Sequence, residues 1–172
     1  MKKHLTLAAI SAALLISPTQ AFAQDAADLA EEDITATVRY VLPLMLEAVS
    51  RKCAPHLAAD GFMATNGDML LVKYSEGSAV HWPAAKQVFI AIGEDKEPGS
   101  TAIFNELPDS AVKPLMDAII PQMLLEEVKP ESCPVIERTL ELIEPLPADN
   151  VAALGGLFFT MSQEEEAHED GG

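Results

Sequence analysis

The chain has 172 residues, of which 49% are hydrophobic, 5% aromatic and 22% charged. This composition is typical of a globular protein and argues against a disordered, collagen-like or disulfide-dense chain. Its 27 acidic residues against 11 basic ones give a formal net charge of -16, which argues against a nucleic-acid partner, because that binding depends on Lys and Arg neutralising phosphates.

The first 23 residues are predicted to be a signal peptide. Two lysines follow the initial Met, residues 5–16 are mostly apolar, and Ala21-Phe22-Ala23 forms a small-x-small end, which are the three parts of such a peptide. The apolar stretch is well short of the roughly 20 residues that a spanning helix needs. We expect cleavage between Ala23 and Gln24, and a soluble protein in the periplasm or outside the cell, with no integral membrane span.

Negative charge gathers at the two ends of the expected mature chain. Removal of residues 1–23 leaves 9 basic and 27 acidic residues, a net charge of -18. Five acids lie within residues 25–33 and five within residues 164–170. The segment 163–172 cannot bury enough apolar surface to offset its ordering entropy, so we predict a disordered acidic tail after a single helical domain over residues 24–162. The interpretation of the tail as a binding site for cations or for a basic partner stays open.

Helical periodicity dominates the remaining sequence. In Glu31–Cys53, apolar residues recur at alternating steps of four and three, which predicts a central amphipathic helix with a kink at Pro43. Trp82-Pro83 is expected to begin a further helix, because proline suits a first turn. Glu94–Ser100 reads as a charged loop.

Residues 62–74 are ambiguous. Asn66-Gly67 lies between apolar runs, where it can mark a tight hairpin or a break between two helical pieces. The run that follows lacks the alternation of a half-buried strand, and the chain offers it no partner strands, so the helical break is preferred.

Three more helices are expected after Asp109. The first is expected to be capped by Asp109 or Ser110 and kinked or split near Pro121, and the second to be capped by Ser132. The last is predicted to run from about Ala148 to Met161. Its inner face is taken to be Val151, Leu154, Phe158 and Met161, and that of the first to be Val112, Leu115, Met116, Ile119, Ile120 and Met123. The sequence thus predicts an all-α fold, a single compact bundle of about five to seven helices, several of them kinked by proline.

The chain has two cysteines, Cys53 and Cys133. In an exported protein they are expected to form one disulfide that acts as a structural crosslink. A reactive dithiol is the alternative, since Cys53 follows two basic residues and Cys133 lies at a predicted helix start, and both positions favour a thiolate. Neither cysteine is part of a Cys-x-x-Cys motif.

Few residues are candidates for chemistry. His56 and Asp60 are four apart, and on a helix a carboxylate at that spacing orients an imidazole for base chemistry or metal binding. The pair is isolated, so a surface interaction is the simpler interpretation. Asp95 to Glu106 resembles a calcium loop in part, but Ser100 replaces the glycine required at its sixth position. No metal site, catalytic residue or cofactor is predicted.

The sequence favours a non-catalytic protein that binds another protein or an envelope component. A carrier of a small molecule or cation, with a pocket between helices, is the alternative. A thiol redox protein or a hydrolase built on His56 and Asp60 comes third.

Overall fold

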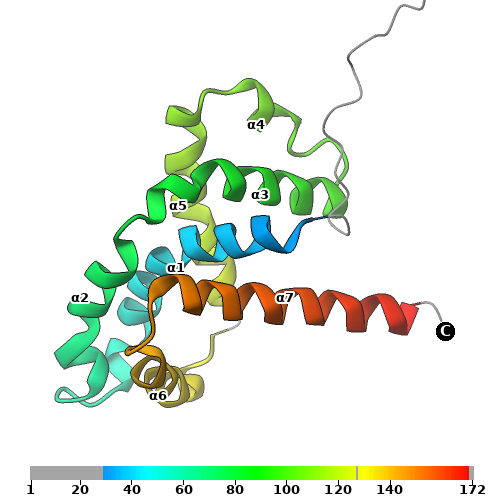
Figure 1. Ribbon diagram of the computed structural model, residues 1–172. Coiled ribbons are helices and arrows are strands. Elements are labelled where there is room, and N and C mark those ends of the chain that lie inside the picture. The colour runs from blue at the N-terminus through cyan, green and yellow to red at the C-terminus, as the bar shows by residue number, and fades with distance from the viewer. Residues whose placement is uncertain (1–28, 127, 171–172) are drawn as a thin grey trace, which may run out of the picture.

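The computed structural model describes residues 29–126 and 128–170, and Figure 1 shows their arrangement. Over these residues the chain forms seven α-helices joined by short turns and three single 3₁₀ turns, with no strand, which confirms the all-α fold class. The predicted signal peptide and cleavage site lie outside the described residues. The helices are α1 Glu31–Cys53, α2 Phe62–Ser75, α3 Trp82–Lys96, α4 Ala102–Glu106, α5 Asp109–Glu126, α6 Cys133–Ile143 and α7 Ala148–Asp170.

Helix α1 is the centre of the fold. It contacts α2, α3, α5 and α7, and its buried residues lie on more than one side, from Ile34 near its start to Cys53 at its end. A helix that is apolar over more than one stripe must be covered on several sides. The core accordingly forms around α1 in three clusters, which are Tyr40, Val41, Trp82, Ala85, Val112, Met116 and Ile120; Ala48, Val49, Cys53, Leu125 and Cys133; and Leu46, Leu70, Tyr74 and Val151.

Helix α2 runs without interruption through Asn66-Gly67, so the predicted break there is wrong, and the hairpin alternative is excluded as well. Two tertiary contacts account for this. Leu70 and Tyr74 are completely buried in the third cluster, and their burial exceeds the roughly 1 kcal/mol that a mid-helix glycine costs. Helix α6 also contacts the start of α2, because the Glu137 carboxylate accepts a hydrogen bond from the backbone N–H of Met63 at 2.9 Å.

The proline-containing helices are also continuous. Pro43 lies within α1, and Pro114 and Pro121 lie within α5. Of the two alternatives predicted for α5 near Pro121, a kink or a split, the split is therefore excluded. Each proline removes one backbone donor. However, Val112 and Ile120, which lie close to the two prolines of α5, are buried against α1 and α3. Tertiary packing therefore holds this helix together.

The segment that follows α3 differs from the predicted loop. Helix α3 extends to Lys96, and residues 102–106 form the short helix α4. Glu94 organises the turn between them, because its carboxylate accepts hydrogen bonds from the Gly99 N–H at 2.6 Å and from the Thr101 hydroxyl at 2.8 Å. These bonds lower the pKa of Glu94, with the Gly99 bond contributing most.

The predicted helix caps are wrong as well. Ser132 makes no capping hydrogen bond, because a 3₁₀ turn over Pro130–Ser132 leads into α6. Asp109 is already inside the first turn of α5, and its carboxylate pairs with Lys86 of α3 at 2.8 Å. A tertiary ion pair thus uses the side chain that the sequence pattern assigned to a local cap.

Helices α7 and α1 approach closely at a pair of glycines. A Cβ atom on Gly156 would lie 2.4 Å from the Oγ1 of Thr35, and one on Gly155 would lie 2.8 Å from a methyl carbon of Val38. Both distances are too short for real contacts. Glycine is therefore required here for close packing of two helices, at a cost in helix propensity of roughly 1 kcal/mol each.

Replacing Gly156 by Ala is expected to destabilise the protein by about 1–2 kcal/mol, because overpacking outweighs the gain in helix propensity. Gly67→Ala is the matched control, since a Cβ there meets nothing within 4 Å and should stabilise α2 by up to about 1 kcal/mol. Urea unfolding of the two variants measures both effects. Opposite signs are expected, and Thr35→Ala should restore part of the loss in Gly156→Ala. Stabilisation by Gly156→Ala alone would contradict the close approach.

The order of contacts shows that α7 runs antiparallel to α1. Asp149, at the start of α7, meets Arg39 of α1, and Gly156, two turns later, meets Thr35. Figure 1 shows α7 continuing past the first turn of α1. The acidic first turn of α1 and the C-terminal end of α7, which are far apart in sequence, thereby lie at the same end of the described structure.

The predicted tail, residues 163–172, falls largely on the end of α7. The backbone is helical as far as Asp170, no side chain past Ser162 is described, and residues 171–172 lie outside the described part. The extent of α7 thus exceeds the predicted end at Met161.

Candidate interaction surface

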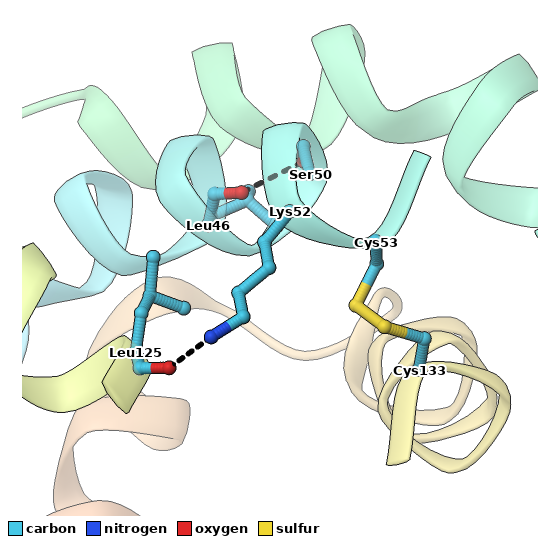
Figure 2. Close-up of a disulfide and its surroundings, with 6 residues drawn as sticks. All are labelled: Leu46, Ser50, Lys52, Cys53, Leu125 and Cys133. Carbon is cyan, nitrogen blue, oxygen red and sulfur yellow. Dashed lines mark hydrogen bonds between the residues drawn. A yellow bond between two sulfur atoms is a disulfide. The ribbon is translucent and has the colours of Figure 1, made fainter. Parts of the chain in front are cut away.

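Cys53 and Cys133 form a disulfide that joins the end of α1 to the start of α6 (Figure 2), as predicted, with their Cα atoms 5.4 Å apart. Each cysteine is only 1% exposed and packs in the second core cluster. Beside the disulfide, the ammonium of Lys52 donates a hydrogen bond to the carbonyl of Leu125 at the end of α5. Thiol exchange needs access to a sulfur atom, so this burial favours the structural role over the reactive dithiol.

His56 and Asp60 are not on one helix, so the geometry considered for them is wrong. His56 ends a 3₁₀ turn after α1, Asp60 lies in the following turn, and both side chains are exposed. No hydrogen bond or ion pair joins them. The chain leaves helical conformation after His56, and this removes the spacing that would have aligned the imidazole with the carboxylate.

The partial calcium loop is also dispersed. Asp95 remains in α3, Thr101 is buried with its hydroxyl bound to Glu94, and Glu106 ends α4. Throughout the described part of the chain, no group of three or more His, Cys, Asp or Glu side chains is placed to hold a metal ion.

A polar cluster that the sequence did not indicate lies where α1, α3 and α5 meet. The Tyr40 hydroxyl donates to Asp117, which also pairs with Lys113 at 2.7 Å. The Lys113 ammonium lies 5.0 Å from the Tyr40 ring centre and 5.9 Å from that of Trp82. The two aromatic rings pack at 5.4 Å. The Lys113-Asp117 spacing of four on a helix was the available sequence signal, but the aromatic partners come from other helices.

The indole N–H of Trp82 is buried and makes no hydrogen bond of normal geometry. The carboxylate of Asp109 is close enough for the indole to contribute to lowering the pKa of Asp109, but the ion pair with Lys86 is the larger cause.

The polar cluster is arranged for stability and not for proton transfer. Burial, and then the hydrogen bond to Asp117, raise the pKa of Tyr40 to about 12. Burial alone would lower the pKa of Lys113, but its bonds to Asp117 and Tyr40 raise it above the ordinary value. A general base needs a pKa near the working pH. Here both pKa values are raised, so the Tyr40 phenol stays protonated and the Lys113 ammonium stays charged near neutral pH.

Stability should therefore fall in alkaline solution. A phenol whose pKa is higher in the folded state stabilises the fold fully below pH 10, and this contribution is lost as the pH rises from about 10 to 12, by about 2–3 kcal/mol. Lys113 acts with the same sign. Urea unfolding across this range should show a steeper loss of stability in the wild type than in Tyr40→Phe. Burial also raises the pKa of Tyr74, so the Tyr40→Phe variant should keep a smaller alkaline loss that comes from Tyr74 and Lys113. Equal pH slopes in the wild type and Tyr40→Phe would contradict the prediction.

Two hollows between helices are open to solvent and have charged or polar side chains in their walls. One of about 330 Å³ lies between α2 and α6, and another of about 340 Å³ lies between α1 and α5. Their walls include Asn66, Glu137 and Arg138 in the first, and Arg51, Lys52 and Glu126 in the second. Small-molecule sites are usually enclosed and mostly apolar, so these hollows give the carrier alternative no support.

Apolar side chains on the outside of α5 and α7 are the most unusual feature of the surface. The predicted inner faces are only partly correct. Val112, Met116, Ile120 and Val151 are buried, but Leu115, Ile119 and Met123 of α5 and Leu154, Phe158 and Met161 of α7 are exposed. In α7 the reason is the glycine pair, because α1 covers the side of the helix with the smallest residues, and the large apolar side chains are left outside.

We define the α7 stripe as Leu154, Leu157, Phe158 and Met161, all exposed, with Phe158 67% exposed. These residues are spaced i, i+3, i+4 and i+7, so they form one continuous face over two turns. An apolar face of this kind on a folded protein is typical of an interaction site. Across the described helices, none combines the length and the apolar character needed to cross a membrane.

No protein-family model, curated protein or solved structure matches this chain. The fold and surface define it as an all-α bundle with one disulfide and an apolar stripe on its C-terminal helix.

Proposed function

We propose that this protein is exported and acts without catalysis, by binding another protein or an envelope component through the exposed apolar face of α7. The observation that supports the proposal is the α7 stripe, where four large apolar residues share one exposed face of a helix whose other face is packed on α1. Burying each of these side chains at an interface would contribute up to roughly 1.5–3 kcal/mol.

Two further observations agree with a binding role. The cluster of Tyr40, Lys113 and Asp117 holds its groups in unreactive protonation states, and His56 and Asp60 are separated. Export rests on the signal-peptide pattern of residues 1–23, and a buried disulfide is compatible with an oxidising compartment.

Site-specific photocrosslinking in living cells tests the proposal. A photoreactive phenylalanine analogue replaces Phe158 in one strain and Val135 in another; Val135 is 68% exposed on α6 and serves as the matched control. A discrete crosslinked product from position 158 and none from position 135 is expected. No product from either position, or the same products from both, would contradict binding through α7.

The location is tested on the same protein. The N-terminus of protein recovered from the periplasmic fraction should be Gln24, whereas an intact Met1 in the cytoplasm would contradict export. Native mass spectrometry should give the mass of the chain alone, and a retained small ligand would favour the carrier alternative.

A further inference from the structure

In the sequence of α7, acidic residues and no Lys or Arg follow the α7 stripe. After Met161, the same helix carries Glu164, Glu165, Glu166, Glu169 and Asp170 in its sequence, and no Lys or Arg occurs anywhere after Arg138. Because α7 runs antiparallel to α1 and extends past its start, the first turn of α1, with three further acids at residues 31–33, lies at the same end.

This arrangement specifies the chemistry of the partner. A second copy of the chain would bring a net charge of -16, or -18 after the expected cleavage, against another of the same sign, which opposes pairing. An anionic lipid surface would be repelled for the same reason. A partner helix with apolar residues at every third or fourth position, followed by Lys or Arg, would bury the stripe and place its cations beside the acidic end.

We propose that the α7 stripe binds a basic amphipathic helix of another protein, with Phe158 and Met161 in the apolar contact and the acidic end of α7 and α1 facing the basic residues of the partner. This inference rests on the proposed function and identifies the class of partner for the same surface. The apolar contact provides affinity, and the charges provide orientation and speed of association.

The test uses labelled helical peptides of about 20 residues, long enough to form a helix on binding. The probe contains Leu and Lys in an amphipathic pattern. One comparison peptide has the same composition with Leu spread around the helix, and the other has Glu in place of Lys. Fluorescence anisotropy measures the affinity of each peptide for the protein recovered from cells that express the full chain.

Phe158→Asp and Val135→Asp form a matched pair of variants, because each introduces one negative charge at an exposed apolar residue. Simple attraction between a negative protein and a positive peptide predicts that both variants bind more tightly. Binding through the stripe predicts that Phe158→Asp weakens the Leu/Lys probe by at least about tenfold, while Val135→Asp retains wild-type affinity. Unchanged thermal unfolding of both variants shows that the fold is intact.

Four other outcomes would contradict the basic amphipathic partner. Equal binding of the Lys and Glu probes, both weakened by Phe158→Asp, would overturn the basic partner but leave the proposed interface. Dimerisation that Phe158→Asp abolishes would identify a second copy as the occupant, and binding to phosphatidylcholine vesicles but to no peptide would identify a lipid surface; both overturn the inference. If no probe binds and position 158 gives no crosslink in cells, the proposed function fails as well.

Discussion

Loss of the Cys53–Cys133 disulfide is expected to destabilise the protein by about 4.5 kcal/mol, from the chain entropy released when the crosslink is removed. The two cysteines are 80 positions apart, so the crosslink closes nearly half of the chain. Stability of a typical domain is only about 5–15 kcal/mol. The same loss should lower the melting temperature by roughly 15 °C.

The measurement compares urea unfolding of the oxidised protein, the reduced protein and the double variant Cys53→Ala/Cys133→Ala. Replacing both cysteines by Ala avoids leaving a lone buried thiol. The double variant should resemble the reduced wild type and should not respond to reductant, which makes it the control for side effects of the reducing agent. Reduction that leaves the free energy of unfolding unchanged would show that the crosslink does not stabilise this fold.

Replacement of Arg39 by Met is expected to cost about 2–4 kcal/mol, because the buried carbonyl of Tyr74 and the partly buried carbonyl of Glu76 lose their donor. Arg39 is buried, and its guanidinium donates to the carbonyl of Tyr74 at 2.6 Å and to that of Glu76. It also pairs with Asp149 at 3.0 Å. One side chain of α1 thereby holds the end of α2 and the start of α7.

Two control variants separate the carbonyl contacts from the ion pair. Asp149 is 85% exposed, so Asp149→Asn should change the free energy of unfolding by less than about 1 kcal/mol. Arg51→Met removes an exposed pair with Glu47 on the same helix and should have a similarly small effect. Chemical denaturation of the three variants gives the comparison. An effect of Arg39→Met no larger than that of Arg51→Met would refute the proposed anchoring.

The helices were predictable where a local pattern and a start or stop signal coincide. Glu31–Cys53 has a regular apolar repeat, and α1 has these bounds; Trp82-Pro83 begins α3 as expected. The predictions failed where a tertiary contact competes with a local signal. Asn66-Gly67 is a turn signal, yet α2 continues because of contacts with α1, α6 and α7.

The candidate site was less predictable than the fold. The apolar residues of α7 were visible in the sequence, but the side of the helix that α1 covers was not. An apolar stripe shows that one face of a helix is suited to burial. It does not show which other helix packs on that face or how closely the two helices approach. The cluster of Tyr40, Lys113 and Asp117 was missed for a similar reason, since Tyr40 lies more than 70 residues before the other two members in the chain.

The sequence by itself determined the helical class and the disulfide pair, because helical periodicity is local and two cysteines allow one pairing. Only the tertiary structure decided which apolar residues of α7 are left outside and that the end of α7 lies at the same end of the fold as the acidic first turn of α1. Both outcomes depend on the antiparallel packing of α7 on α1 through Gly155 and Gly156. That packing is set by the fit of side chains between helices distant in sequence, which no local pattern contains.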